Sequence, residues 1–327
     1  MQATRPLPWY PGPKLMPFDF KHDARREIKF LELIGQGLHS IVFRAEIDGQ
    51  VYAVKLFRFI HPSMLVCPDF VEKGWVTIEQ VIFQNDPFFS ECRAYGRLKD
   101  AQSEHLAARC YGYVLLTAAQ EAELDDRGCA TSWDRRDATR GRPIRGIVKE
   151  YIPDGGGPPF TFDMLPRMKR DVRDLNALGI INWDIREDNY RCGRLVDFSQ
   201  ARTSPHMELD LHSALVPRNV VAECCVRDQA CFDDMVQLWN EEHPAQRFWG
   251  YFLPDPVFGR RLRDRSRYRL SLKKSEGASL AAALYDWRPR ARRPESRTTG
   301  EGAKGQRKRG RRATTPSKLS KRIRRSK

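Results

Sequence analysis

The chain has 327 residues, enough for one two-lobed domain or two small ones, and its hydrophobic content of 41% is ordinary for a soluble protein. Its net charge of +15 is unevenly distributed. Residues 288–327 contain 17 Lys and Arg but only two Asp and Glu, whereas the first 287 residues hold the remaining 40 basic and 40 acidic groups. The body is therefore neutral, and the tail carries the whole excess charge.

Cysteine usage and hydropathy exclude several classes of protein. Eight cysteines occur without any Cys-x-x-Cys spacing, and five prolines among the first 17 residues would break the apolar helix of a secretory signal. We therefore expect free thiols in a reducing compartment. No apolar run approaches the roughly 18 residues that a membrane helix needs, so we expect no membrane association.

The Pro-rich residues 1–26 suggest an extended arm that lies on the body. The following residues predict a three-stranded antiparallel meander with a Gly-rich first turn and an Asp-Gly second turn. Its strands cover residues 28–34, 40–45 and 51–57, and its turns contain Gly35, Gly37, Asp48 and Gly49.

The Gly-x-Gly turn and Lys55 each allow two interpretations. Glycines often serve turn geometry alone, but at a turn between strands they also let backbone N–H groups approach phosphate oxygens. Because this turn joins two strands rather than a strand and a helix, it argues against a dinucleotide-binding fold. Lys55 lies in an otherwise apolar strand, where it is either a surface residue or a cation that reaches the phosphates.

A helix over residues 88–99 is indicated by Asp86 as N-cap and Pro87 at the first helical position. Residues 58–85 before it read as an irregular, insertion-like connection. Glu91 falls on the apolar face of this helix, and a buried carboxylate needs a partner. Lys55 is the natural candidate, unless Glu91 lies at the rim of that face and is solvated.

The remaining body alternates strands, loops and helices. We expect strands over 112–116 and 144–152, a loop over 118–143, and a lobe boundary at the glycines that follow Pro153. The clearest helix covers residues 165–178, with Gly179 as its C-cap. Further helices are expected around residues 232–239 and 279–285.

The stretch from Gly179 to Ser199 brings together Asp184, Asn189 and Asp197. A two-residue turn at Cys192-Gly193 predicts a tight hairpin that returns Asp197 to the side of Asn189. Two oxygen ligands on a rigid backbone suit a Mg²⁺ ion that carries nucleotide phosphates. Each acid alone would usually be a cap or a solvated loop residue.

The order of these features resembles the eukaryotic protein-kinase fold over about residues 28–245. The resemblance implies an α+β, two-lobed structure, with an antiparallel sheet and one helix in the N-lobe (27–152) and a mainly helical, shortened C-lobe (153–287). It implies ATP and Mg²⁺ as ligands. By position, it implies catalytic roles for Asp184, Lys55, Glu91 and Arg186, nucleotide contacts from Gly35, Gly37, Ser40, Val42, Ala53, Lys55, Glu150 and Ile152, and metal ligation by Asn189 and Asp197.

Several departures from the kinase pattern put phosphate transfer in doubt. Asn182-Trp183 replaces the His-Arg pair before the catalytic Asp, and Arg186 replaces the usual Lys, although a guanidinium is not equivalent to an ammonium. Ser199 replaces the Gly of Asp-Phe-Gly, Ser40 stands where the third loop glycine is usual, and no Ala-Pro-Glu motif follows.

Three phrases, residues 33–40, 90–98 and 184–190, are similar to a fungal kinase-like family named for the Fta-two subunit of the Sim-four inner-kinetochore complex. That resemblance covers about residues 10–205. It implies nuclear residence, protein partners in a kinetochore assembly and a part in chromosome segregation.

Two functions stay open at this point. One is an active Ser/Thr-type phosphotransferase with Asp184 as base; the other is a pseudokinase-like binding module in a nuclear assembly, with or without nucleotide. A metal site from His206, His212 and the cysteines at 224, 225 and 231 is disfavoured by its irregular spacing.

The tail over residues 288–327 has a composition that predicts disorder. Its basic clusters, 307–312 and 321–325, suggest nuclear import or non-specific nucleic-acid contact, against the alternative of a merely solvated tail.

Overall fold

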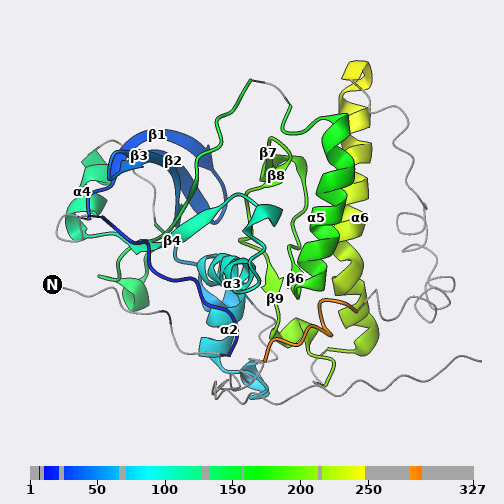
Figure 1. The fold of residues 1–327 in the computed structure, drawn as a ribbon. Helices are drawn as coiled ribbons and strands as arrows, with labels where there is room; N and C mark the ends of the chain where they lie inside the picture. The colour runs from blue at the N-terminus through cyan, green and yellow to red at the C-terminus, as the bar shows by residue number, and fades with distance from the viewer. Residues whose placement is uncertain are drawn as a thin grey trace, which may run out of the picture. The chain divides into compact units, whose positions relative to one another are not determined.

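The computed structural model describes residues 7, 11–21, 26–65, 71–126, 133–156, 158–212, 216–246 and 280–288. These residues form an α+β structure, with a five-stranded antiparallel sheet followed by the helices α5 (Leu165–Ala177) and α6 (Arg218–Glu242) (Figure 1). The arrangement is compatible with the expected two-lobed fold. No helix in the described ranges is long and apolar enough to cross a membrane.

The sheet has the strand order β1-β2-β3-β5-β4. The predicted Asp48-Gly49 turn joins β2 to β3, and both turn residues have positive φ, 51° and 75°, as a type I′ turn requires. Alternate residues of β2 enter an apolar core, which explains the period-2 pattern of its sequence. The strands are β1 (Lys29–Gln36), β2 (Ser40–Ile47), β3 (Gln50–Phe57), β4 (Cys110–Leu115) and β5 (Arg145–Glu150).

Helix α3 (Pro87–Asp100) begins where the sequence predicts. The Asp86 carboxylate accepts a hydrogen bond of 3.0 Å from the N–H of Phe88, and Pro87 occupies the first helical position. Nearly all of its residues through Leu98 are buried, because the helix contacts both strand β5 and the short strand β9 (Arg202–Thr203). Its position fixes Glu91 between the sheet and the rest of the molecule.

Three expectations about helices are wrong. Helix α2 (Ile78–Asn85) lies in the segment expected to be an irregular connection, and α4 (Ala118–Asp126) lies in the expected loop. Each begins with a reciprocal Thr–Gln pair of hydrogen bonds, Thr77 with Gln80 and Thr117 with Gln120. The N-terminal part of the described chain thus holds α2 and α4 in addition to the one expected helix, α3. In contrast, residues 280–284 form a turn where a helix was expected, and Ser279 lies outside the described residues.

Helix α5 buries the predicted stripe of Leu165, Met168, Val172 and Leu175, and it packs beside α6. The chain leaves α5 through Gly179, whose φ of 78° fits the predicted C-cap. Short elements complete the structure: strands β6 (Ile180–Ile181), β7 (Tyr190–Arg191) and β8 (Arg194–Leu195), and 3₁₀ turns η1 (Pro62–Met64), η2 (Glu104–Leu106), η3 (Asp137–Thr139), η4 (Phe162–Met164), η5 (Glu187–Asn189), η6 (Met207–Leu209) and η7 (Pro244–Gln246).

Two arginines fasten α3 to the segment that follows β9. The Arg93 guanidinium donates to the carbonyl oxygens of Thr203 (2.8 Å) and Pro205 (2.5 Å), and Arg97 donates to that of Ser204 (2.6 Å). Burial and the neighbouring charge of Arg97 lower the pKa of Arg93 to about 9. Since these donors are buried and have only backbone acceptors, moving α3 would leave several polar groups unpaired.

The described part of the N-terminal arm lies directly on α3 and β4. Backbone hydrogen bonds join Tyr113 to Met16 (3.1 Å) and to Phe18 (2.8 Å), and Leu15 is buried. At Gly96 in α3, an added Cβ would lie 2.6 Å from the carbonyl carbon of Lys14. The arm therefore approaches α3 so closely that only a glycine fits.

Because of this contact, we predict that a Gly→Ala substitution at Gly96 destabilises the protein, which is the opposite of its usual effect in a helix. Gly→Ala inside a helix normally adds up to about 1 kcal/mol of stability. Gly96→Ala should instead lower the free energy of unfolding by about 1–3 kcal/mol, because its Cβ would collide with the arm backbone. Denaturant unfolding measures the change, with Gly155→Ala as a control because no atom lies within 4 Å of its added Cβ. A stabilised Gly96→Ala protein would show that the arm does not lie on α3.

Candidate functional site

A cavity of about 430 Å³ lies between the Gly-rich end of the sheet and the loop that follows β6. All of the residues expected to bind nucleotide or metal line it. They are Gly35, Gly37, Ser40, Val42, Ala53, Lys55, Glu150, Ile152, Asn189 and Asp197, together with Arg186. Glu91 and Asp184, also expected at the site, contact these residues without lining the cavity themselves.

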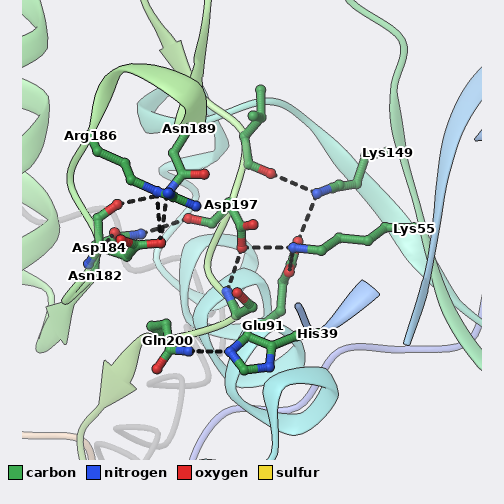
Figure 2. Close-up of polar contacts among 12 residues, drawn as sticks. His39, Lys55, Glu91, Lys149, Asn182, Asp184, Arg186, Asn189, Asp197 and Gln200 are labelled. Atoms are coloured by element: carbon green, nitrogen blue, oxygen red, sulfur yellow. Dashed lines mark hydrogen bonds and ion pairs between the residues drawn. The ribbon is translucent and has the colours of Figure 1, made fainter. Parts of the chain in front are cut away.

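Lys55 joins the two sides of this cavity. Its ammonium nitrogen lies 2.7 Å from Glu91 Oε2 and 2.7 Å from Asp197 Oδ1 (Figure 2). Lys55 and Glu91 are almost fully buried, whereas a quarter of the Asp197 side chain is exposed. The solvated-rim alternative for Glu91 is therefore wrong, and the expected Lys55–Glu91 pair is present.

The opposite charges of Lys55 and its carboxylate partners stabilise one another. Burial alone would lower the pKa of Lys55, but the carboxylates of Asp197 and Glu91 raise it above its ordinary value. Burial would likewise raise the pKa of Asp197, yet the ammonium groups of Lys55 and Lys149 hold it well below its usual range. Lys55 and Asp197 are thus both charged at neutral pH.

Lys149 is a member of the site that sequence reasoning missed. Its ammonium nitrogen lies 2.7 Å from Glu91 Oε1 and donates to the carbonyl oxygen of Val196 at 2.6 Å. The signal was present in the sequence, because Lys149 follows Ile147 and Val148 in a buried strand, as Lys55 lies between Val54 and Leu56.

Asp184, Asn189 and Arg186 come together in the loop after β6. The Asn189 side-chain amide donates to Asp184 twice, to the backbone oxygen at 2.8 Å and to Oδ2 at 2.9 Å. Arg186 Nε lies 3.3 Å from the same Oδ2, and more than half of its side chain is exposed. The Asp184 carboxylate is therefore oriented by two neighbours rather than free in solvent.

Buried Asp228 on α6 organises the start of this loop, and sequence reasoning did not identify it. It accepts hydrogen bonds from the backbone N–H groups of Asn182 (2.6 Å) and Trp183 (2.8 Å) and from the side chain of Asn176 (3.0 Å). Burial raises its pKa to about 6, although these hydrogen bonds act in the opposite direction. The available signal was an acid on the apolar face of a helix.

Asn182 and Trp183, the two departures before Asp184, both have structural partners. The Asn182 side chain donates to the backbone oxygen of Asp197 at 2.7 Å, which ties the two acidic segments together. Trp183 has a φ of 70°, and the guanidiniums of Arg202 and Arg227 lie over its ring at 4.8 and 4.7 Å. The substitutions are accommodated without disrupting the loop.

The Gly-rich turn has open space around its glycines. Neither Gly35 nor Gly37 has a positive φ, and an added Cβ would meet nothing closer than 3.7 Å. Turn geometry and packing thus leave the choice of glycine here unexplained. His39, in the same turn, contacts Gln200 at 2.6 Å, and burial lowers its pKa.

Glu150 closes the cavity at the other end of the sheet. Its carboxylate pairs with Arg194 at 2.7 Å and accepts a hydrogen bond from the N–H of Arg109 at 3.1 Å. The side chain is therefore occupied by protein partners. A polar ligand contact at Glu150 would therefore have to come from its backbone.

Asn189 and Asp197, the two expected metal ligands, both line the cavity. The Cys192-Gly193 turn has φ values of 50° and 68°, and the hairpin it closes brings Val196 N within 2.8 Å of Asn189 O. Because the Asn189 amide donates to Asp184, its carbonyl oxygen is available for a cation, and oxygen donors suit Mg²⁺. In the described ranges, no group of three His, Cys, Asp or Glu could hold a metal, so the His and Cys alternative is not supported.

The role of Asp228 can be tested by a conservative substitution. Asp228→Asn would place an amide N–H₂ against backbone N–H donors, and we expect a loss of about 2–4 kcal/mol in the free energy of unfolding. Glu223→Gln, on an exposed position of the same helix, is the control and should change stability little. Urea unfolding followed by circular dichroism gives both values. Equal stability of the two variants would contradict the role assigned to Asp228.

Comparison with known proteins gives one result that bears on identity. A search of curated proteins found no match. The family model of the kinetochore Sim4 complex subunit FTA2 matches residues 3–202, which is more than half of the chain and includes every residue of the cavity. The protein therefore belongs to the kinetochore Sim4 complex subunit FTA2 family.

Proposed function

We propose that the protein is a kinase-like, Mg-ATP-binding subunit of a nuclear kinetochore assembly and acts mainly as a binding module in chromosome segregation. Membership of a kinetochore subunit family supports a kinetochore-related role, nuclear residence and protein partners in a complex. The observation that carries the nucleotide proposal is the 2.7 Å contact of Lys55 with Asp197 across the cavity. It sets a phosphate-binding cation beside a metal-binding carboxylate.

The kinase-like fold is supported by the relation of several parts. A protein kinase places a Gly-rich loop over the phosphates, pairs a strand lysine with a helix glutamate, and holds metal with an Asp and an Asn. In this protein Gly35, Gly37, Lys55, Asn189 and Asp197 line one cavity, and Glu91 pairs with Lys55 behind it. The open space around the two glycines has a simple explanation if phosphate oxygens approach there.

The residues have distinct tasks in this proposal. Lys55 and the N–H groups of the Gly-rich turn bind phosphate, Val42 and Ala53 contact the base, and Asn189 and Asp197 hold Mg²⁺. The metal would neutralise phosphate charge when bound. The backbone at Glu150 and Ile152 supplies polar contacts to the base edge.

The binding-module function rests on the departures around Asp184. Arg186 pairs with the Asp184 carboxylate, and a catalytic base must instead be free to accept a hydroxyl proton. An active Ser/Thr phosphotransferase is the second candidate. It is favoured by the two Asn189 hydrogen bonds that orient Asp184 beside the metal-binding residues.

Nucleotide binding should appear as thermal stabilisation. Saturating Mg-ATP at a hundredfold excess over Kd should add about 2.7 kcal/mol, which is roughly 5–10 °C in Tm for a domain of this size. Asp197→Asn should abolish the shift because it removes the negative charge that would hold the metal. Asp188→Asn should retain it, because Asp188 also lines the cavity but lies outside the buried ion pairs. A wild-type Tm that does not respond to Mg-ATP would reject the nucleotide proposal.

Phosphate transfer separates the two candidate functions. If Mg-ATP binds, transfer of labelled γ-phosphate is compared between the wild type and Asp184→Ala. Equal background in both proteins supports the binding module. Activity that only the wild type shows would establish a phosphotransferase.

The basic tail, whose residues 289–327 lie outside the described chain, is proposed to direct nuclear import or to contact nucleic acid. Deleting residues 288–327 should abolish nuclear accumulation or nucleic-acid retention and leave Tm within about 1 °C, because no core residue is removed. Full-length protein with Gln at the basic positions of 307–312 and 321–325 separates charge from length. Normal localisation and retention after deletion would count against this role.

A further inference from the structure

The Glu91 carboxylate has two counter-ions rather than one. Lys55 contacts Oε2 and Lys149 contacts Oε1, each at 2.7 Å, and Glu91 has no exposed surface. With Asp197, these side chains form a group with two positive and two negative charges. A single lysine on a buried glutamate would already complete an ion pair, so the second one requires an explanation.

Lys149 also reaches the segment that carries Asp197. It donates to the carbonyl oxygen of Val196, the residue directly before Asp197, at 2.6 Å. Lys149 therefore links helix α3 to the metal-binding segment without involving Lys55. Figure 2 shows this second path, with Lys149 between Glu91 and the backbone carbonyl above it.

We propose that Lys149 is a positioning residue that holds Glu91 and the Asp197 segment in place, which frees the Lys55 ammonium to bind a ligand phosphate. The part that concerns phosphate rests on the proposed function. The electrostatic part, a shared neutralisation of Glu91 by two lysines, holds for the protein without any ligand.

The reason lies in the cost of an uncompensated buried charge. If Lys55 were the only counter-ion, turning its ammonium toward a phosphate would weaken its contact with Glu91 inside the protein, where a carboxylate without a partner is strongly unfavourable. With Lys149 on the other oxygen, Glu91 remains paired throughout. Lys55 can then give up its contact with Asp197, and part of its contact with Glu91, and bind a ligand phosphate instead.

A double-mutant cycle on the unliganded, full-length protein tests this sharing. Lys55→Met and Lys149→Met keep an apolar chain of similar length and remove one ammonium each. Each single variant should lower Tm by about 2–6 °C, because one lysine still neutralises Glu91. The double variant should lose at least about 5 °C more than the sum, since Glu91 then has no counter-ion. Additive losses would overturn the proposal.

Two further variants keep the test decisive. Lys169→Met removes the partner of Asp233 on a different pair of helices, so it should be additive with Lys149→Met. Adding Glu91→Gln removes the buried charge itself and should abolish the coupling between Lys55 and Lys149. If the double variant fails to fold, Glu91→Gln should restore a cooperative transition, and a triple variant that stays unfolded would contradict the proposal.

Isothermal titration calorimetry with Mg-ATP tests the part of the proposal that concerns phosphate. Lys149→Met should weaken Mg-ATP binding by about tenfold, because Glu91 then retains Lys55, whereas Lys169→Met should leave Kd unchanged. Unchanged affinity in Lys149→Met would overturn the part of the proposal that concerns phosphate. If wild-type protein binds no Mg-ATP, the proposed function fails, while the cycle on unliganded protein still decides whether Lys149 shares Glu91.

Discussion

The molecule depends on a carboxylate that water does not reach. Glu91 must be neutralised by protein groups, and both of its neutralising lysines come from the sheet while Glu91 itself comes from helix α3. One of these lysines continues to Asp197 and the other to Val196, both in the segment after β8. A single buried charge thereby ties together the sheet, the helix and the loop that surround the cavity.

Helix α3 is fixed from every side that the structure describes. Arg93 and Arg97 donate to backbone carbonyls after β9, the Asp86 cap pairs with Arg145 of the sheet at 3.1 Å, and the N-terminal arm lies against Gly96. Phe198, the residue after Asp197, packs its ring edge against Tyr95 at 5.1 Å. Displacing the helix would at once break ion pairs, expose aromatic surface and leave buried guanidinium groups without acceptors. Such a helix suits a permanently assembled cleft better than one that is switched.

The loop before Asp184 illustrates how a departure from a motif can keep the architecture. Asp228 binds the backbone of Asn182 and Trp183, and backbone donors are independent of side-chain identity. These hydrogen bonds therefore do not require particular side chains at the two positions, and the Trp183 ring contacts the guanidiniums of Arg202 and Arg227. The loop before Asp184 is thus held by buried hydrogen bonds in a protein of a kinetochore subunit family.

Much of the local structure could be predicted from the sequence. The Asp48-Gly49 and Cys192-Gly193 turns need positive φ at both residues, and the stripe of α5 needs one buried face. Each of these features depends on a few neighbouring residues, so the sequence predicts it directly. The pairing of Lys55 with Glu91 also followed, because a lysine and a glutamate in apolar surroundings require each other. The helices α2 and α4 were not predicted, because a Thr-x-x-Gln cap is a short signal and prolines and polar residues surround it in this chain.

Only the tertiary structure determined which charged side chains contact the same partner. Lys149 and Asp228 have no local signature beyond a charge in an apolar segment, and their partners lie 58 and 46 residues away. The sequence alone indicated that Glu91 would need a cation if its helix face is buried, because a buried carboxylate without a partner is costly. It could not determine that two cations converge there, because that convergence depends on the antiparallel pairing of β3 with β5 and on the packing of α3 beneath them.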